Sequence, residues 1–340
     1  MNAFAEATLL RLRQSPGVET AAISLGLPYE RLLNIGFRHG DGPEASAQQG
    51  RMTTATYTTP EYFPALRIPL RAGRLFDDRD SAAAPRVVIV SETIVRDYFG
   101  GENPVGRRIQ LSGAEREIVG VVGDVQLKPS FGDRGPIAPM PLTYLPLAQT
   151  SDGFLRQVHV WFGTSIIVRA RGGETGIVPL MRGAVDAVDP MLPFAEVRSM
   201  ADVQAQAVAL PRLLMVLLVT LAGAAVGLAA LGIHGLISSS VAERTREIGI
   251  RMALGATTAR AVRTVAMPGV LLAAIGIVIG AIASRAATTL IQSFVWGVSP
   301  TDPVTYGAVA LLFVTVAVVA SVLPALRILR LDPAKTLRAE

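Results

Sequence analysis

Residues Leu213–Ala242 read LLMVLLVTLAGAAVGLAALGIHGLISSSVA, and His234 is the only ionisable side chain in this run. A helix that crosses a bilayer needs about 20 mostly apolar residues, so the run is long enough to span a membrane. Two further runs without charge follow, Thr264–Ser284 and Pro303–Leu326. Three such runs are improbable as buried helices of a soluble protein. They predict three transmembrane helices, at about 213–240, 264–290 and 304–326.

The composition of the chain agrees with a membrane protein. Of its 340 residues 50% are hydrophobic and only 17% are charged, whereas soluble domains average about 25% charged residues. The mean hydropathy is +0.43. So much apolar surface excludes an intrinsically disordered chain. The absence of cysteine excludes a disulfide-stabilised scaffold.

The basic residues of the chain are concentrated in its C-terminal part. Residues 211–340 carry 11 Lys and Arg against 5 Asp and Glu, while residues 1–210 carry 21 against 22. These basic residues flank the apolar runs and do not form a stripe on a soluble domain. The pattern therefore favours a membrane protein with charged cytoplasmic ends over a nucleic-acid-binding protein.

The loops between the apolar runs predict the orientation in the membrane. Five arginines lie in the 242–263 loop, and four Lys and Arg follow Leu326, but the 292–302 loop has none. Positive residues stay on the cytoplasmic side. The 242–263 loop and the C-terminus are therefore expected in the cytoplasm, and residues 1–210 outside it. No signal peptide is visible to export residues 1–210, so we expect a preceding transmembrane helix outside this sequence. The alternative is that the first span acts as a reverse anchor.

Residues 1–210 are predicted to form an outer domain of mixed α and β structure, because short Val- and Ile-rich segments alternate with helical patterns. The predicted strands are Glu19–Leu25, Met52–Tyr57, Arg86–Val90, Arg107–Leu111, Glu117–Val122, Ser165–Ala170 and Phe194–Val197. The predicted helices are Asn2–Gln14, Glu92–Phe99, Gly176–Val188 and Met200–Leu210. The stretch Lys128–Pro146 is dense in Pro and Gly and is predicted to be an irregular loop.

Sequence motifs of enzymes are absent. The chain has no G-x-x-x-x-G-K-[ST], no G-x-S-x-G and no H-E-x-x-H. The three histidines, His39, His159 and His234, are too scattered to predict a metal site. Gly120–Asp124 lacks the glycine spacing of a dinucleotide-binding loop and is predicted to form a tight turn. We therefore expect no catalytic residue, metal or cofactor in this chain.

The loop after the first apolar run carries the most informative pattern. Glu243 and Arg246 are three residues apart, and Glu247 and Arg251 are four apart, which suits one side of a helix. Ile248, Met252 and Leu254 add apolar side chains, and Gly255 suits a helix C-terminus. The pattern predicts a short helix that docks a soluble partner; a solvated connector with positive charge is the alternative.

The same loop carries a resemblance to a known family. Glu243-Arg-Thr-Arg-Glu-Ile-Gly-Ile-Arg-Met-Ala-Leu-Gly-Ala256 closely resembles the coupling segment of MacB/FtsX-type ABC transporter permeases, and Asp332–Glu340 and Leu323–Arg327 resemble the family's C-terminal end. The segments that resemble its periplasmic core domain are Pro16–Glu19, Tyr62-Phe63, Gly73–Phe76, Asn103–Gly106 and Ile118–Asp124. The resemblance covers nearly the whole chain and is closest to the group with two fused permease halves.

The resemblance implies an architecture and a mechanism. It implies a periplasmic domain with a porter-like part and an inserted subdomain, here at about 86–146, followed by an FtsX-like permease domain at 211–340. Such permeases have four spans per half, so this chain departs from the family pattern by lacking the first. They pair with a second half or a second copy and with an ABC ATPase that binds ATP and Mg²⁺. They are thought to move the periplasmic domain by mechanotransmission.

Two sets of residues are predicted to carry this function. The coupling residues are Glu243, Arg244, Arg246, Glu247, Ile248, Gly249, Arg251, Leu254 and Gly255, with Glu247, Gly249 and Arg251 foremost. Gly223 and Gly227, and Gly276 and Gly280, offer small faces for helix packing in the bilayer, although general Ala and Gly richness explains them equally well.

A bacterial inner-membrane export permease is the function expected from these features. The alternatives are a lipoprotein-release permease, a non-transporting FtsX-like signal transducer and a truncated remnant. An enzyme has no supporting motif.

Overall fold

The structure is a computed structural model of the chain. It describes residues 2–39, 51–111, 113–132, 134–172, 176–192, 196–253, 267, 271, 274–286 and 303–325. The chain divides into two compact units, Met1–Leu210 and Pro211–Glu340. We describe each unit by itself.

The first unit mixes helices and strands, which confirms the predicted α+β content. Its helical elements are α1 (Asn2–Gln14), α3 (Tyr62–Leu66), α4 (Glu92–Tyr98), η1 (Leu147–Gln149), α5 (Asp152–Val158) and α6 (Ile177–Asp186). Its strands are β1 (Val18–Ser24), β2 (Leu33–His39), β3 (Met52–Thr58), β4 (Leu70–Gly73), β5 (Val87–Ser91), β6 (Arg108–Leu111), β7 (Ala114–Val122), β8 (Gln126–Leu127), β9 (Ala138–Pro139), β10 (Leu142–Pro146) and β11 (Ser165–Ala170).

Six strands of this unit close into a ring. Going round, β3 pairs with β10, β10 with β5, β5 with β7, β7 with β6, β6 with β2, and β2 again with β3. Closure pairs every strand of the ring on both sides, so the ring has no open edge. The range 86–146, expected as an insert, supplies β5, β6, β7 and β10, and β2 and β3 complete the ring.

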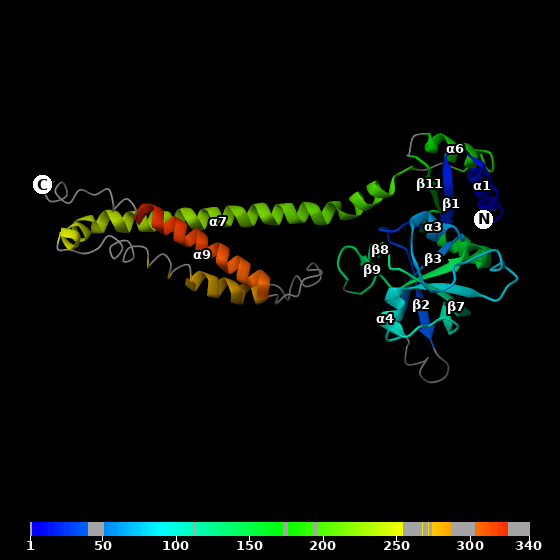
Figure 1. Cartoon of the computed structure of the whole chain (residues 1–340), viewed down its shortest axis with the longest axis horizontal. Coiled ribbons are helices and arrows are strands. Elements are labelled where there is room, and N and C mark those ends of the chain that lie inside the picture. The colour runs from blue at the N-terminus through cyan, green and yellow to red at the C-terminus, as the bar shows by residue number, and fades with distance from the viewer. Residues whose placement is uncertain are drawn as a thin grey trace. The chain divides into compact units, whose positions relative to one another are not determined.

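A second part of this unit is built on β1 and β11. β1 pairs with β11 along its length and meets β3 at one position, Ser24 with Thr58. Helix α1 contacts both β1 and α6, and these elements lie close together in Figure 1. Leu9 and Leu12 of α1 are buried against β1 because they lie on one helical face.

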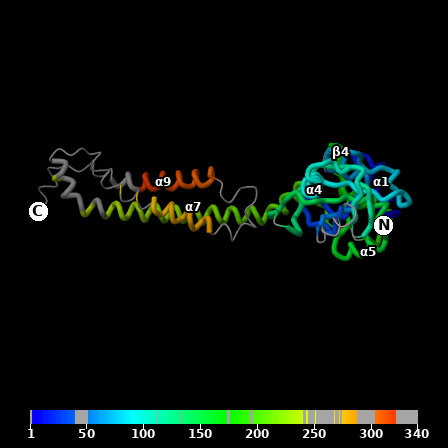
Figure 2. Tube along the Cα trace, turned by 90° about the horizontal axis from the view of Figure 1, so that it is seen from below, coloured from blue at the N-terminus to red at the C-terminus, as the bar shows by residue number. Residues whose placement is uncertain are grey.

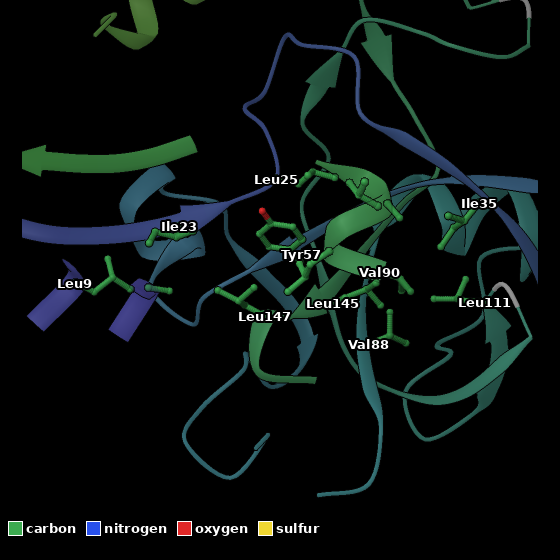
Figure 3. Packing of buried hydrophobic residues seen from close by; sticks show 14 of the residues in the cluster. Leu9, Ile23, Leu25, Ile35, Tyr57, Val88, Val90, Leu111, Leu145 and Leu147 are labelled. Atoms are coloured by element: carbon green, nitrogen blue, oxygen red, sulfur yellow. The ribbon is translucent and has the colours of Figure 1, made fainter. Parts of the chain in front are cut away.

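The main core joins these two parts. Figure 3 shows Leu9 and Ile23 on one side of Tyr57, and Val88, Val90 and Leu111 on the other. A second buried cluster on the opposite face of the strands contains Tyr62, Phe63 and Tyr144, whose rings meet edge to face or tilted at 5.0–5.8 Å. These aromatic contacts stabilise the packing of α3 against the sheet.

Most predicted elements of the outer domain are confirmed, and four predictions need correction. The prediction of an irregular loop at Lys128–Pro146 is wrong, because β10 within it is a fully buried strand of the ring. The predicted turn at Gly120–Asp124 is wrong as well: Gly120 lies inside β7, opposite Gly73 of β4. The predicted strand Phe194–Val197 lies partly outside the described residues, and Glu196 and Val197 are not in a strand.

The helix predicted at Met200–Leu210 does not end before the first apolar run. Instead α7 runs without interruption from Met200 to Ala253, with Pro211 inside it. Figure 2 shows this helix from a second direction. The separate short helix expected after residue 242 is therefore the last part of α7. Proline has no amide hydrogen, so the helix lacks one backbone hydrogen bond at Pro211.

Two described helices are long and apolar enough to cross a membrane. They are α7, in its part Met200–Ser239, and α9 (Pro303–Ala325), in its part Pro303–Ala320. The span predicted at 264–290 is represented by a shorter apolar helix, Ala274–Ala286, and its flanks lie almost entirely outside the described residues. Two of the three predicted spans thus have full-length helices.

Candidate functional site

The predicted coupling segment is helical over most of its length. Glu243 to Ala253 form the last turns of α7, and Leu254, Gly255 and Ala256 lie outside the described residues. One helix therefore carries Glu243, Arg244, Arg246, Glu247, Ile248, Gly249 and Arg251. Among them Glu243 is exposed, and the neighbouring Ile250 exposes 44% of its surface.

The glycine pairs predicted for helix packing lie on described helices. Gly223 and Gly227 are in α7, one turn apart and hence on one face, and Gly276 and Gly280 are in the helix Ala274–Ala286. A Cβ atom added at any of the four would meet no described atom within 4 Å. The packing role of these four glycines stays a prediction.

A large groove in the outer domain forms a second candidate site. It has a volume of about 1380 Å³ and runs beside β11, whose six residues all line it. The other walls include the loop Leu25–Arg31, the segment Ala65–Pro69, residues around Asp124–Lys128 and Trp161–Thr164, helix α6 and the start of α7. Apolar side chains such as Ile166, Val168 and Met181 lie beside charged ones, so the groove is amphipathic.

One ion pair connects the wall of this groove to the start of α7. Arg198 Nη2 donates a hydrogen bond to Glu30 Oε1 at 2.7 Å, and its Nη1 donates to Gln206 Oε1 at 3.2 Å. Arg198 Nε also lies 3.6 Å from a carboxylate oxygen of Glu196. Arg198 comes directly before Ser199, which caps α7 by accepting from the amide of Asp202 at 3.1 Å.

Backbone contacts fix the loop that carries Glu30. Its carboxylate accepts from Leu27 N at 3.2 Å, and its carbonyl accepts from Lys128 N at 3.2 Å. Tyr29 N donates to Gln126 O at 2.6 Å, and Tyr29 has a left-handed backbone with φ of 68°. Burial raises the pKa of Tyr62, and the negative charge of Glu30 raises it further. These hydrogen bonds hold the loop in place, and Glu30 on this loop accepts the hydrogen bond from Arg198.

Sequence reasoning missed the pair of Glu30 and Arg198. The two residues are 168 positions apart, and neither lies in a recognisable motif. The only local sign was the Ser199–Asp202 spacing, which is typical of a helix N-terminus.

The structure gives a physical reason for two of the motifs that carried the resemblance. Gly73–Phe76 and Ile118–Asp124 meet where β4 pairs with β7. Asp124 Oδ1 accepts a hydrogen bond from the amide of Thr93 at 2.7 Å, close to the start of α4. Arg74 donates two hydrogen bonds to the buried carboxylate of Asp80, at 2.8 and 2.7 Å. These contacts hold the outer domain together.

The three histidines lie in separate parts of the chain, and two contacts fix the ring of His159. His159 Nε2 lies 3.0 Å from Tyr57 Oη, and its Nδ1 lies 3.1 Å from the carbonyl of Phe162. Within the described ranges no cluster of three or more His, Cys, Asp or Glu could hold a metal ion. The carboxylates singled out above face arginines or backbone amides.

Family models match the chain in two consecutive parts. Residues 2–176 match the MacB-like periplasmic core domain, and residues 213–333 match the FtsX-like permease C-terminal domain. The chain belongs to the MacB/FtsX-type ABC transporter permeases. The resemblance inferred from the coupling segment and the outer-domain motifs is thereby confirmed.

Curated relatives include export permeases. The permease is 27% identical over 85% of its length to the "Macrolide export ATP-binding/permease protein MacB" of Azoarcus sp. and covers 43% of that protein. It is 26% identical over 82% of its length to the "Uncharacterized ABC transporter permease YknZ" of Bacillus subtilis and covers 68% of it. It spans less than half the length of the MacB proteins of Azoarcus and Wolinella succinogenes.

Among solved structures, the permease is similar to the periplasmic region of MacB from Actinobacillus actinomycetemcomitans. The two are 15% identical with a TM-score of 0.37, and the match covers 55% of this chain and 73% of the other. It is also similar to the extracellular domain of the transporter YknZ from Gram-positive bacteria, with 16% identity, a TM-score of 0.36 and 54% and 82% coverage.

Proposed function

We propose that this permease transmits ATP-driven movement from a cytoplasmic ABC ATPase to its outer domain, and that this movement exports a substrate. The observation that carries the proposal is α7. This helix begins directly after its cap, Ser199, which lines the groove. It contains the apolar run 213–242 and ends in the predicted coupling segment. This helix has 54 residues.

An unbroken helix suits the transmission of force. Apart from the bond that Pro211 cannot make, its backbone hydrogen bonds are made within the helix, so lipid does not leave them unpaired. A displacement at Glu247 can therefore reach the outer domain without unfolding any part between them. Pro211, which interrupts the hydrogen bonding of α7, supplies a point at which the helix can bend.

The partners follow from the same proposal. An ABC ATPase binds ATP and Mg²⁺ and docks on the segment 243–256, and this chain holds no cofactor and is not itself an enzyme. The small faces at Gly223 and Gly227 pack against a second permease half or a second copy in the bilayer.

Residues 1–210 lie on the periplasmic side of the bacterial inner membrane, and the C-terminus is cytoplasmic. No nucleic acid is bound.

Export is the direction of transport that the relatives support. MacB of Azoarcus is named for macrolide export, and PvdT of Pseudomonas aeruginosa for pyoverdine export. Both are named as ATP-binding and permease proteins. We extend export to this permease, with a substrate that reaches the outer domain from the periplasmic side.

Purification from native membranes tests the proposal. The permease is captured through a C-terminal tag, and mass spectrometry identifies the proteins that come with it. We expect an ABC ATPase among them, and ATP-dependent transport by the reconstituted complex. Capture of an envelope enzyme whose activity depends on the permease, with no transport, would instead identify a signal transducer. Capture without any ATPase would contradict the mechanism.

A further inference from the structure

The start of α7 is tied to the outer domain by one side chain. Arg198 contacts Glu30, which lies 168 positions earlier in the chain, and Gln206, on the second turn of α7. Because the residue after Arg198 is the cap Ser199, the guanidinium group sits where the outer domain becomes helix α7. A change in the direction of α7 relative to the outer domain must therefore move this group.

The ion pair is more sheltered than most surface pairs. The side chains of Arg198 and Glu30 expose 28% and 30% of their surface, whereas that of Glu196 exposes 69%. One turn along α7, Val203 is 2% exposed and packs against the outer domain. Partial burial reduces screening by salt and water, so this pair resists separation more than the contact with Glu196.

The two partners differ in how firmly the chain holds them. Glu30 lies on the loop that Lys128 and Gln126 fix through backbone hydrogen bonds. A Cβ atom at Gly26 on the same loop would lie 2.5 Å from Cδ2 of the buried Leu32 side chain. Arg198, in contrast, is followed directly by α7. Glu30 is thus held by the outer domain, whereas Arg198 is directly connected to α7.

We propose that Arg198 and Glu30 are positioning residues that clamp the base of α7 to the outer domain and carry its movement into that domain. The inference rests on the proposed function, because it assigns the point at which a movement of α7 acts on residues 1–210. Neutralising either partner leaves ATP hydrolysis intact and loses the movement of the outer domain. Reversing both charges restores the pair and the movement.

Distance measurements between spin labels test the clamp. Residues 1–340 contain no cysteine, so a label at Gln110→Cys on β6 is site-specific when the assembled partners are cysteine-free. Spin-labelled lipid headgroups supply the second label, so that the distance reports the movement of the outer domain relative to the bilayer. The complete transporter is reconstituted in lipid nanodiscs. The distance distribution is recorded without nucleotide and with ATP and vanadate. ATPase activity and thermal unfolding are measured in parallel.

The variants separate the clamp from the proposed function. We expect Glu30→Gln and Arg198→Gln to lose the nucleotide-dependent distance change while hydrolysis continues. Glu30→Arg combined with Arg198→Glu should regain the change, and the control Glu196→Gln should keep it. If Arg198→Gln does not fold, Glu30→Gln and Arg198→Lys provide the comparison.

Two results would overturn the clamp. One is a wild-type distance change in both neutralised variants; the other is a charge-reversed pair that folds but does not recover. A wild-type transporter that hydrolyses ATP with no distance change would instead refute the proposed function itself.

Discussion

The backbones of Gly73 and Gly120 are in direct contact where β4 pairs with β7. A Cβ atom on Gly120 would lie 2.2 Å from the carbonyl oxygen of Arg74, and one on Gly73 would lie 2.2 Å from that of Val119. Gly73 also has a φ of 72°, which disfavours other residues. This contact gives Gly73–Phe76 and Ile118–Asp124, the two family-like motifs, a shared structural role.

Substitution of Gly120 by alanine should destabilise the outer domain. Because the added methyl group meets backbone, which cannot rotate away, we expect Gly120→Ala to lower the free energy of unfolding by about 2 kcal/mol or more. Gly36→Ala is the control, since Gly36 lies in β2 and no described atom lies within 4 Å of its Cβ position. Thermal unfolding measures both. Equal stability of the two variants would show that the contact is not tight.

The pair of Arg74 and Asp80 should contribute measurably to stability. Asp80 is 5% exposed and receives two hydrogen bonds from Arg74 and one from the amide of Asp77. Loss of its charge leaves Arg74 without a full partner, so Asp80→Asn should cost about 1–3 kcal/mol. The neighbouring exposed Asp78, changed to Asn, should cost under about 0.5 kcal/mol. Denaturant titration compares the two variants.

Alkaline pH should destabilise the outer domain in part through Tyr57. Burial raises the pKa of Tyr57 from 10.0 to about 12, and its hydrogen bond with Thr164 lowers it in part. The folded protein therefore keeps a proton that the unfolded chain releases. Below pH 10 Tyr57 is protonated in both the folded and the unfolded protein, and its contribution to the free energy of unfolding is fully present. This contribution is lost as the pH rises from 10 through 12, where only the unfolded chain releases the proton easily. Burial also raises the pKa of Tyr62 and Tyr144, so several groups share the loss.

Tyr57→Phe isolates the contribution of this one group. We expect its stability to fall less steeply than that of the wild type between pH 10 and 12, by roughly 1.4 kcal/mol per pH unit. At neutral pH the variant should lose about 1 kcal/mol, because the hydroxyl contacts with His159 and Thr164 disappear. Unfolding free energies at several pH values give both numbers. Parallel curves for the two proteins would refute the assignment.

Changes in the predicted coupling segment should separate hydrolysis from transport. Glu247→Lys reverses a charge, and Gly249→Trp adds bulk, on the part of α7 proposed to meet the ATPase. We expect coupled transport to fall at least about tenfold, which corresponds to 1.4 kcal/mol of coupling free energy, while the fold persists. Gln204→Lys, exposed near the start of α7, is the charge control. Wild-type coupled transport in both segment variants would refute docking there.

The elements that the sequence predicts well are those with a strong local pattern. Helix α1 and strand β11 match their predicted bounds because amphipathic spacing and a run of β-branched residues determine them locally. The apolar runs 213–242 and 303–326 likewise predict the long helices α7 and α9.

Other features depend on contacts that no local pattern encodes. Strand β10 reads Leu-Thr-Tyr-Leu-Pro and follows a stretch rich in Pro and Gly, but it is a strand because β3 and β5 pair with it on both sides. Helix α7 continues through Pro211, beyond the predicted end at Leu210. The Glu30–Arg198 pair joins distant parts of the chain, so only the fold brings it together. Tertiary context overrides local propensity at each of these places.

The central claim is that the end of α7 docks on an ABC ATPase. A photo-crosslinking amino acid placed at Ile250, which is 44% exposed, tests it most directly. The same group at Trp161, 82% exposed in the outer domain, is the control. After irradiation of intact cells, we predict an adduct between the permease and the ATPase from position 250 and none from position 161. An active transporter that gives no ATPase adduct at position 250 would contradict the account.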